Sequence, residues 1–471
     1  MSAKIVATIG PKTADPESLR ALHAAGMGMA RLNGSHADLA WHAETIRLIR
    51  TTLPEIPILL DIPGRKIRTA LLANPPSFRT GDVIVLTGRP GHDGSDKVSV
   101  SYERLHEDLQ AGNVILADDG TLRFTVVEIR GHDILCRADV DGTLKSRKGI
   151  NVPYVSLRTA LVTERDRTMT AFAREQGIDY VGISFVESAA HVTGIRALIG
   201  APWPGIVAKV ENQGGLENVD EICAAADAIM IDRGDLSVET RLETMALAQK
   251  RIIRAARQAA KPVIVATEML HTMIDNPFPT KAEVSDITNA VLDGCAATML
   301  SGETAVGRFP VEAVTMMRTI SDAAAHHYQA EMDLGTPADG FSIPGAIDEA
   351  IALICRRVPV TKIVAVTKSG YAARRISSRL PRQPILAVTN EESAARSFNL
   401  LYGTLGVHVD VPFEKAGTGH IPVCLESLWR RGLIVADDLI VVTAATYPKS
   451  GNRMNLIQLH RVSDLAEVMG W

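Results

Sequence analysis

The sequence predicts an α/β fold: a (β/α)8 barrel, with a small β-barrel lid domain inserted into it and a C-terminal α/β domain after it. Eight short apolar runs alternate with amphipathic helical stretches over the first 320 residues. Their hydrophobicity is continuous, which is typical of parallel strands buried on both faces. Eight such units favour a closed barrel over an open doubly wound sheet, for which a Gly-x-Gly-x-x-Gly turn after the first run is missing. The runs are Ile5 to Ile9, Met27 to Leu32, Ile56 to Leu60, Tyr180 to Ser184, Ile206 to Val210, Ala228 to Ile231, Val263 to Ala266 and Ala297 to Leu300.

The third βα unit contains a long segment of a different pattern. Between residues 70 and 155, short alternating strands such as Val83 to Leu86 are separated by Gly, Asp, Asn and Pro. We expect an inserted β domain at 70–155, acting as a lid on a barrel formed by 1–69 and 156–335. A linker-like stretch then leads to a C-terminal regulatory α/β domain at 340–471. Its expected strands are Lys362 to Thr367, Ile385 to Thr389 and Leu439 to Thr443.

The composition argues against several classes of function. With 471 residues, 46% hydrophobic and 22% charged, the chain is typical of a soluble protein of several domains. A net charge of -4 gives no reason to expect a nucleic acid or an anionic membrane as partner. No apolar stretch approaches the roughly 20 residues that span a bilayer. The first residues enter a strand pattern without signal-peptide architecture, so we expect a cytoplasmic protein.

Charged and polar residues stand where the predicted barrel strands end. Lys209 and Glu211 close the fifth strand, and Asp235 follows the sixth. The active site of a (β/α)8 barrel lies at this face, and carboxylates beside an ammonium group suit a divalent metal with a phosphorylated or enolic substrate. Thr267 and Ser301 follow the seventh and eighth strands, where capping of the next helix is the alternative role.

The order of its motifs makes the whole chain resemble the pyruvate kinase family. No one of these motifs is specific alone, but together and in this order they are. They are Lys4-Ile-Val-Ala-Thr-Ile-Gly-Pro11, Arg31-Leu-Asn-x-Ser-His36, Lys148-Gly-Ile-Asn-Val-Pro153, Lys209-Val-Glu-Asn212, Arg233-Gly-Asp-Leu236, Asn276-Pro-x-Pro-Thr-x-Ala-Glu283 and Met299-Leu-Ser-Gly-Glu-Thr304.

The resemblance implies phosphoryl transfer from phosphoenolpyruvate to ADP, giving pyruvate and ATP. It implies Mg²⁺ or Mn²⁺ bound by Glu211 and Asp235, with Lys209 stabilising the transferring group. The catalytic residues it implies are Lys209, Arg31, Thr267 and Ser301. The substrate-binding residues are Arg233, Gly234, Asp235, Thr267 and Ser184, with the Gly234 and Asp235 N–H groups holding the substrate carboxylate. The nucleotide-side residues are Arg68, His36, Asn33 and Lys148.

The resemblance extends to the lid and the C-terminal domain. In the lid, Asp118-Asp119-Gly120 matches an acidic turn that covers the substrate, unless it is a plain hairpin turn. A sugar-phosphate effector site is implied at Thr367, Lys368, Ser369 and Gly370, with the Arg374-Arg375 pair and the Pro448–Gly451 loop. The alternative there is a strand-to-helix turn with solvated arginines. The family also implies a homotetramer.

The turn after the third strand departs from the family pattern. It reads Asp61-Ile-Pro-Gly-Arg-Lys66, with Ile62 in place of a threonine and Lys66 in place of a glutamate. The family's K⁺ site therefore loses oxygen ligands and gains a fixed cation. We predict activity without K⁺, with Lys66 supplying the charge beside the remaining site residues, unless Lys66 faces solvent. Those residues are Asn33, Ser35 and Asp61.

Three further departures bear on the substrate. Asp232, Gly34 and Ser237 stand where the family has Ala, Phe and Gly. An extra carboxylate at Asp232 would repel an anionic substrate unless it is paired, with Arg65 or Arg233 as expected partners. Two alternatives therefore stay open: an enzyme acting on another enol phosphate or a phosphonate, and a metal-dependent enolate-forming lyase. An inactive binding protein is a third, which intact Lys209, Glu211 and Asp235 argue against.

Overall fold

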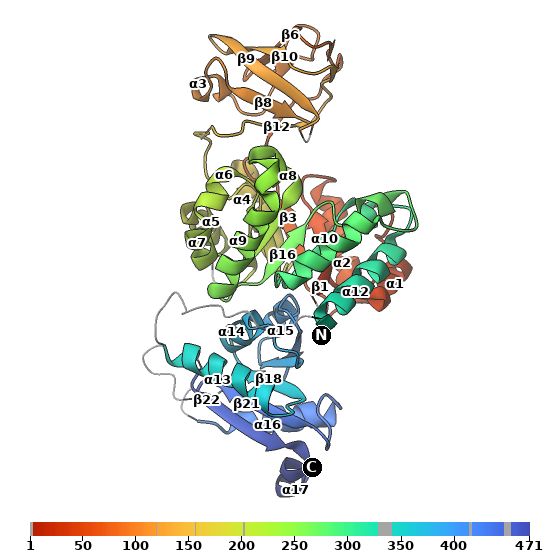
Figure 1. The fold of residues 1–471 in the computed structure, drawn as a ribbon, viewed down its shortest axis with the longest axis vertical. Helices are drawn as coiled ribbons and strands as arrows, with labels where there is room; N and C mark the ends of the chain where they lie inside the picture. Colours follow the sequence, from red (N-terminus) through yellow and green to blue (C-terminus); the bar gives the residue numbers. More distant parts are fainter. Residues whose placement is uncertain are drawn as a thin grey trace.

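The computed structural model describes residues 3–118, 120–155, 157–200, 203–327, 342–413, 417–446 and 454–471. Three bodies follow one another along the long axis of the molecule (Figure 1). The inserted β domain lies at one end, the barrel in the middle and the C-terminal domain at the other end. No helix of the described residues has both the length and the apolar character needed to cross a membrane.

Eight parallel strands close into a barrel, in the order β1-β17-β16-β15-β14-β13-β3-β2. The predicted barrel is confirmed, and each predicted run supplies one strand. The strands are β1 (Lys4–Thr8), β2 (Met27–Asn33), β3 (Ile58–Ile62), β13 (Tyr180–Ile183), β14 (Gly205–Val210), β15 (Ala228–Asp232), β16 (Val263–Ala266) and β17 (Ala297–Leu300).

Helices cover the outside of the barrel, which explains the continuous hydrophobicity of its strands. In β1, Ile5 and Ala7 pack outward in the large core under the helices, whereas Val6 packs inward with Met29 and Met299. The helices are α1 (Pro16–Ala25), α2 (Leu39–Thr52), α4 (Glu164–Glu175), α5 (Ala189–Ile199), α6 (Gln213–Glu217), α7 (Val219–Ala225), α8 (Arg233–Glu239), α9 (Met245–Gln258), α10 (Lys281–Leu292), α11 (Gly302–Ala305) and α12 (Pro310–His327), with 3-10 turns at Leu242–Thr244 and His271–Ile274.

The segment between β3 and α4 forms a separate β domain with its own core, in which Phe124 and Leu86 are fully buried. Its main sheet has seven strands in the order β4-β12-β8-β9-β10-β6-β7, and β11 pairs with β5. The elements are β4 (Ile67–Arg68), β5 (Ser77–Phe78), β6 (Val83–Thr87), β7 (Val98–Ser99), α3 (Leu105–Asp108), β8 (Val114–Ala117), β9 (Leu122–Arg130), β10 (Asp133–Ala138), β11 (Gly142–Thr143) and β12 (Gly149–Asn151).

The C-terminal domain is a five-stranded sheet in the order β20-β19-β18-β21-β22, with helices packed against it. The three expected strands are present, and two edge strands were not predicted. Lys4 Nζ donates to the Thr404 carbonyl oxygen (2.7 Å), and Tyr180 Oη to that of Ser397 (3.1 Å), so this domain contacts the barrel at the N-terminal ends of its strands. The elements are α13 (Ile343–Arg357), β18 (Lys362–Val366), α14 (Tyr371–Ser378), β19 (Ile385–Thr389), α15 (Glu392–Phe398), β20 (Thr404–His408), α16 (His420–Arg430), β21 (Leu439–Ala444), β22 (Leu456–Arg461) and α17 (Val462–Met469).

Candidate active site

Neighbouring strand ends bring a lysine and three carboxylates together at the mouth of the barrel. β14 and β15 pair in parallel, with Val210 opposite Ile231. The next residue of each segment, Glu211 and Asp232, therefore lies beside the other at the carboxyl ends of these strands. Asp235 follows in the first turn of α8. One oxygen from each of these carboxylates lies within 4.8 Å of the others.

The ammonium group of Lys209 lies among these carboxylates. Its Nζ is 2.5 Å from Glu211 Oε1, 3.2 Å from Asp232 Oδ2 and 3.8 Å from Asp61 Oδ2. Burial disfavours the charged amine, but the attraction of Glu211, Asp232 and Asp61 outweighs it and raises the pKa of Lys209. Lys209 is therefore a fixed positive charge in a buried site, where charge acts more strongly than in water.

The pKa values of the three carboxyl groups are shifted in different directions. Burial raises the pKa of Glu211, which is fully enclosed, and that of Asp235. Burial also acts on Asp232, but Lys209 and Arg31 outweigh it and lower the pKa of that carboxyl group. Glu211 Oε2 accepts the Phe185 N–H at 2.7 Å, which orients the carboxylate.

Arg31 forms a second buried ion pair beside Lys209. Its Nε and Nη2 donate to Asp61 Oδ2 at 3.0 and 2.8 Å, and its Nη1 donates to Thr8 Oγ1 at 3.1 Å. The residues face each other because β2 and β3 are adjacent and Arg31 and Asp61 lie near their carboxyl ends. Both predicted residues are thus in the same site as Lys209.

Lys66 reaches this site from the loop after β3. Its Nζ lies 2.6 Å from Asp235 Oδ1, and 5.5 Å from the centre of the Phe185 ring. With its side chain 14% exposed, Lys66 does not face solvent, so that alternative is wrong. Of the other residues of the predicted K⁺-replacing group, Asp61 is on β3, whereas Asn33 and Ser35 lie at the end of β2 and just beyond it, where Asn33 Oδ1 accepts the Ser35 N–H at 3.1 Å.

Thr267 and Ser301 stand at the ends of β16 and β17. Thr267 Oγ1 accepts the Gly234 N–H at 2.8 Å, so the N–H predicted to hold a substrate carboxylate is engaged within the chain. Ser301 Oγ is buried and has no hydrogen-bond partner among the described residues, and it makes no side-chain cap on α11. The capping alternative is therefore wrong for Ser301. Ser184 Oγ donates to the Ile62 carbonyl oxygen and lies 3.4 Å from Lys209 Nζ.

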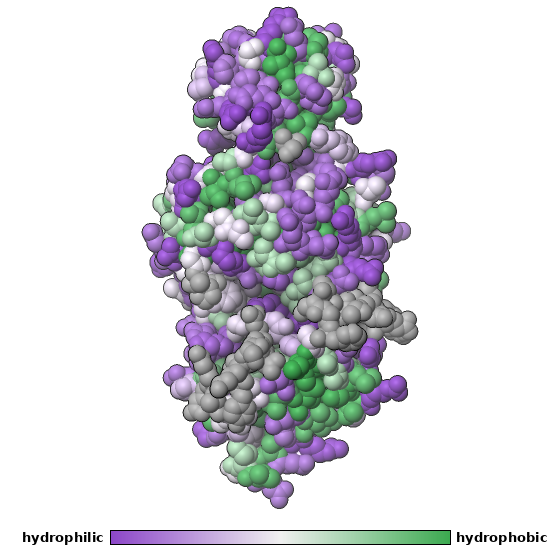
Figure 2. All heavy atoms as spheres, turned by 90° about the vertical axis from the view of Figure 1, so that its left-hand side faces the viewer, coloured by the Kyte–Doolittle hydropathy of each residue, from purple (hydrophilic) through white to green (hydrophobic). Residues whose placement is uncertain are grey.

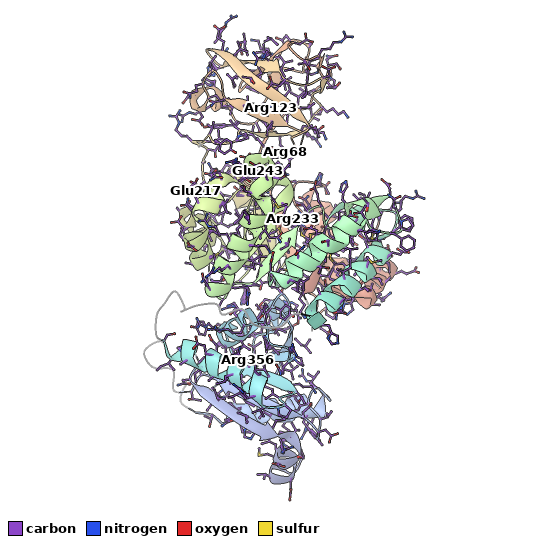
Figure 3. The ribbon with its side chains drawn as sticks, in the orientation of Figure 1. Arg68, Arg123, Glu217, Arg233, Glu243 and Arg356 are labelled. Atoms are coloured by element: carbon purple, nitrogen blue, oxygen red, sulfur yellow. The ribbon has the colours of Figure 1, made fainter. Side chains whose placement is uncertain are left out.

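Arg233 points away from the carboxylate cluster. It pairs with Asp286 of α10 at 2.7 Å and donates to the Thr267 carbonyl oxygen at 2.9 Å. Figure 3 labels Arg233 near this helix. Arg65 pairs with Glu187 at 2.9 Å. The expected pairing of Asp232 with one of these arginines is therefore wrong, because Lys209 is its partner.

Of the residues predicted to face the nucleotide, Arg68 lies between the barrel and the inserted domain, where Figure 3 labels it. Arg68 Nη1 donates to the Arg147 carbonyl oxygen at 3.1 Å, and Lys148 pairs with Asp118 at 2.6 Å. Burial, together with the positive charges of Arg68 and Arg31, lowers the pKa of His36. Asp119 of the acidic turn lies outside the described residues.

Two contacts of the site were not predicted from the sequence. Phe185, with a φ of 55°, orients Glu211 through its N–H and lies beside Lys66 with its ring. Asn151 of β12 donates to Glu239 Oε1 of α8 at 2.7 Å and joins the inserted domain to the barrel. The Lys148–Pro153 motif contains Asn151, but nothing in the sequence connects it with Glu239.

The predicted effector residues Thr367, Lys368, Ser369 and Gly370 form the loop from β18 to α14. Gly370 has a φ of 76°, a conformation that glycine adopts without strain. Arg375 is buried and pairs with Asp348 at 2.6 Å, so the idea that both arginines of the pair are solvated is wrong. The Pro448–Gly451 loop lies outside the described residues.

The carboxylate cluster fits a divalent metal ion. Hard oxygen donors from three side chains suit Mg²⁺ or Mn²⁺, which prefer carboxylates over nitrogen or sulfur ligands. Glu211 Oε1 is buried, and among the described residues the Lys209 ammonium at 2.5 Å is the one donor beside it. An acceptor of this kind is suited to a cation.

Comparisons with known proteins identify the family. The chain matches the family description "Pyruvate kinase, barrel domain" over residues 1–314 and "Pyruvate kinase, alpha/beta domain" over residues 345–460. It is 38% identical to pyruvate kinase 2 of Synechocystis sp., over 98% of this chain and 79% of that protein. It is 37% identical to a pyruvate kinase of Agrobacterium vitis, over 96% and 95%. The crystal structure of a pyruvate kinase from Cryptosporidium parvum superposes with a TM-score of 0.88 at 32% identity, covering 98% of this chain and 96% of that one. The chain belongs to the pyruvate kinase family, and it is a phosphotransferase.

Proposed function

We propose that this enzyme transfers the phosphoryl group of phosphoenolpyruvate to ADP, with Mg²⁺ or Mn²⁺ held by Glu211 and Asp235. One observation carries the residue assignment: the Lys209 ammonium lies beside the carboxylates that would hold the metal. Phosphoryl transfer passes through a loose transition state, so fixed positive charge and positioning supply most of the catalysis.

The side chains around the cluster then take distinct roles. Lys209 and Arg31 stabilise negative charge on the transferring phosphoryl group and on the enolate oxygen. Glu211 and Asp235 would hold a divalent ion, which would supply positive charge to the phosphate oxygens. Thr267 and Ser301 line the position where the enolate receives its proton. Arg68, His36, Asn33 and Lys148 bind the nucleotide from the side of the inserted domain.

We further propose that the enzyme needs no K⁺, because Lys66 supplies the fixed charge. Its ammonium is in direct contact with Asp235 and is largely shielded from solvent. The test is pyruvate formation with saturating Mg²⁺, measured in KCl and in tetramethylammonium chloride of equal osmolarity. We expect rates within about twofold of each other, whereas a large stimulation by K⁺ would reject this role of Lys66.

A different enol-phosphate or phosphonate substrate is the second candidate, favoured by the extra carboxylate of Asp232. The contact between Asp232 and Lys209 supports the first candidate instead, because the additional carboxylate has a cationic partner within the chain. Assaying phosphoenolpyruvate turnover by Asp232→Ala separates the two. A large gain over wild type would indicate a pocket shaped for another substrate.

The C-terminal domain supports two proposals on regulation and assembly. The hydroxyls and the Lys368 amine of the β18–α14 loop suit a sugar phosphate. Figure 2 shows apolar surface on this domain, and its exposed apolar side chains include Ile343 and Leu353 of α13 and Leu459 of β22. Such faces are typical of subunit contacts and support a homotetramer, which light scattering after size-exclusion chromatography would test.

A further inference from the structure

Asp232 brings a third carboxylate to the site proposed for the metal. It is the last residue of β15, and the strand pairing places it beside Glu211. Its oxygen, with one each from Glu211 and Asp235, completes a group whose members lie within 4.8 Å of one another. Within the part of the chain that the structure describes, no other three potential metal ligands of these types come this close.

The two lysines are shared unequally among these carboxylates. Lys66 lies 2.6 Å from Asp235 Oδ1, so one of the two carboxylates assigned to the metal is engaged by a cation of its own. Lys209 lies 2.5 Å from Glu211 and 3.2 Å from Asp232. Because Glu211 and Asp232 share one ammonium group, this pair retains negative charge that Asp235 has lost to Lys66.

Glu211 gives an independent indication of a ligand. Its Oε1 is fully buried and, among the described residues, the Lys209 ammonium at 2.5 Å is the one donor beside it, so a lone pair of this oxygen stays available to a cation. A buried carboxylate oxygen directed into the cluster is a suitable ligand atom for a cation.

We propose that Asp232 is a third carboxylate ligand of the divalent-ion site and compensates for the engagement of Asp235 by Lys66. The inference rests on the proposed function, since it assumes that Glu211 and Asp235 hold the ion. Affinity for a hard divalent cation rises with the number of ligand charges, so this site binds the ion before any substrate phosphate arrives.

The test is Mn²⁺ binding to the full-length protein without phosphoenolpyruvate or ADP, followed by the electron paramagnetic resonance signal of free Mn²⁺. We expect Asp232→Asn to raise the Kd for Mn²⁺ about tenfold or more, as loss of a ligand or its support typically does. Glu243→Gln is the matched control, because it removes one exposed carboxylate from the same end of the barrel, as labelled in Figure 3. It should stay within about twofold of wild type, and an equal result for Asp232→Asn would overturn the proposal.

A second variant tests the compensation without altering Asp232. Lys66→Gln releases Asp235, so Mn²⁺ should bind about tenfold more tightly, and Lys66→Gln/Asp232→Asn should return close to the wild-type Kd. Unchanged affinity in Lys66→Gln would overturn the proposal even if Asp232→Asn did not fold. Wild-type pyruvate formation is measured separately. An inactive wild type whose Mn²⁺ affinity still follows Asp232 would reject the proposed function and retain this inference.

Discussion

Lys66 and Asp235 form an ion pair of 2.6 Å across the mouth of the barrel. The lysine comes from the loop after β3 and the carboxylate from the start of α8, so the contact joins two separate βα loops of the barrel. The side chains are each 14% exposed, which leaves the pair little screened by water.

Reversing the charge at position 66 should make the enzyme depend on K⁺. Lys66→Glu places another carboxylate beside Asp235 and Asp232, so we expect turnover without K⁺ to fall about tenfold or more, with K⁺ restoring much of it. Steady-state rates in KCl and tetramethylammonium chloride measure this. Lys66→Arg keeps the charge and serves as control. Equal rates of Lys66→Glu in the two salts would show that the lysine does not supply the ion's charge.

Removing the central ammonium should impair both chemistry and stability. Lys209→Met deletes the fixed charge at the reacting group, and we expect kcat to fall about 10²–10³-fold. It also leaves Glu211 and Asp232 without their shared partner, which costs about 3–5 kcal/mol in the free energy of unfolding. Arg47→Met, which removes a guanidinium group from the exposed pair with Glu44, should leave the free energy of unfolding close to that of wild type. Near-wild-type turnover of Lys209→Met would be incompatible with its assigned role.

The glycine at position 34 is required by its surroundings. Its N–H donates to the Asp61 carbonyl oxygen, and an added Cβ would collide with that oxygen and lie 2.6 Å from Met169 Cε. We therefore expect Gly34→Ala to destabilise the fold by about 1–3 kcal/mol. Gly419→Ala is the matched control, since its φ of -59° suits any residue and its Cβ would meet nothing within 4 Å. Equal unfolding midpoints for the two variants would contradict this.

The contact between Glu239 and the inserted domain should make stability depend on pH. Burial raises the pKa of Glu239 to about 7, above the ordinary value of 4.5 that holds in the unfolded chain. Between pH 4.5 and about 7 the folded protein therefore retains a proton that the unfolded chain releases. The free energy of unfolding is highest below pH 4.5 and decreases as the pH rises to about 7. The full loss is about 3 kcal/mol.

Glu239→Gln removes this titration and keeps an oxygen to accept the Asn151 amide. Thermal unfolding midpoints at pH 5, 6, 7 and 8 should show wild type falling relative to Glu239→Gln over this range. Parallel pH curves would mean that Glu239 does not titrate in the folded protein.

The local pattern of hydrophobic and polar residues was sufficient to predict the barrel and the residues at its mouth. Continuous apolar runs identified the strands, and parallel strands place their carboxyl ends at one face, which brought Lys209, Glu211 and Asp235 together. The edge strands β20 and β22 escaped prediction. β20 contains Gly406, and β22 has polar residues at alternating positions on an edge.

Side-chain partners between distant segments could not be predicted in the same way. Arg233 directly follows Asp232, yet it turns to Asp286, because the backbone at the start of α8 directs the two side chains apart. The partner of Asp232 comes from the neighbouring strand instead. The contact of Asn151 with Glu239 depends on how two domains meet, and no periodicity in either segment encodes it.

The most direct test of the account is pyruvate formation from phosphoenolpyruvate and ADP by wild type and Glu211→Gln, across a titration of Mg²⁺. Glu211 is placed at the metal and beside Lys209, so the amide should reduce turnover by at least about 10²-fold and shift the Mg²⁺ dependence to higher concentration. Wild type should lose its activity when the metal is chelated. Wild-type turnover and an unchanged Mg²⁺ dependence in Glu211→Gln would contradict the site described here.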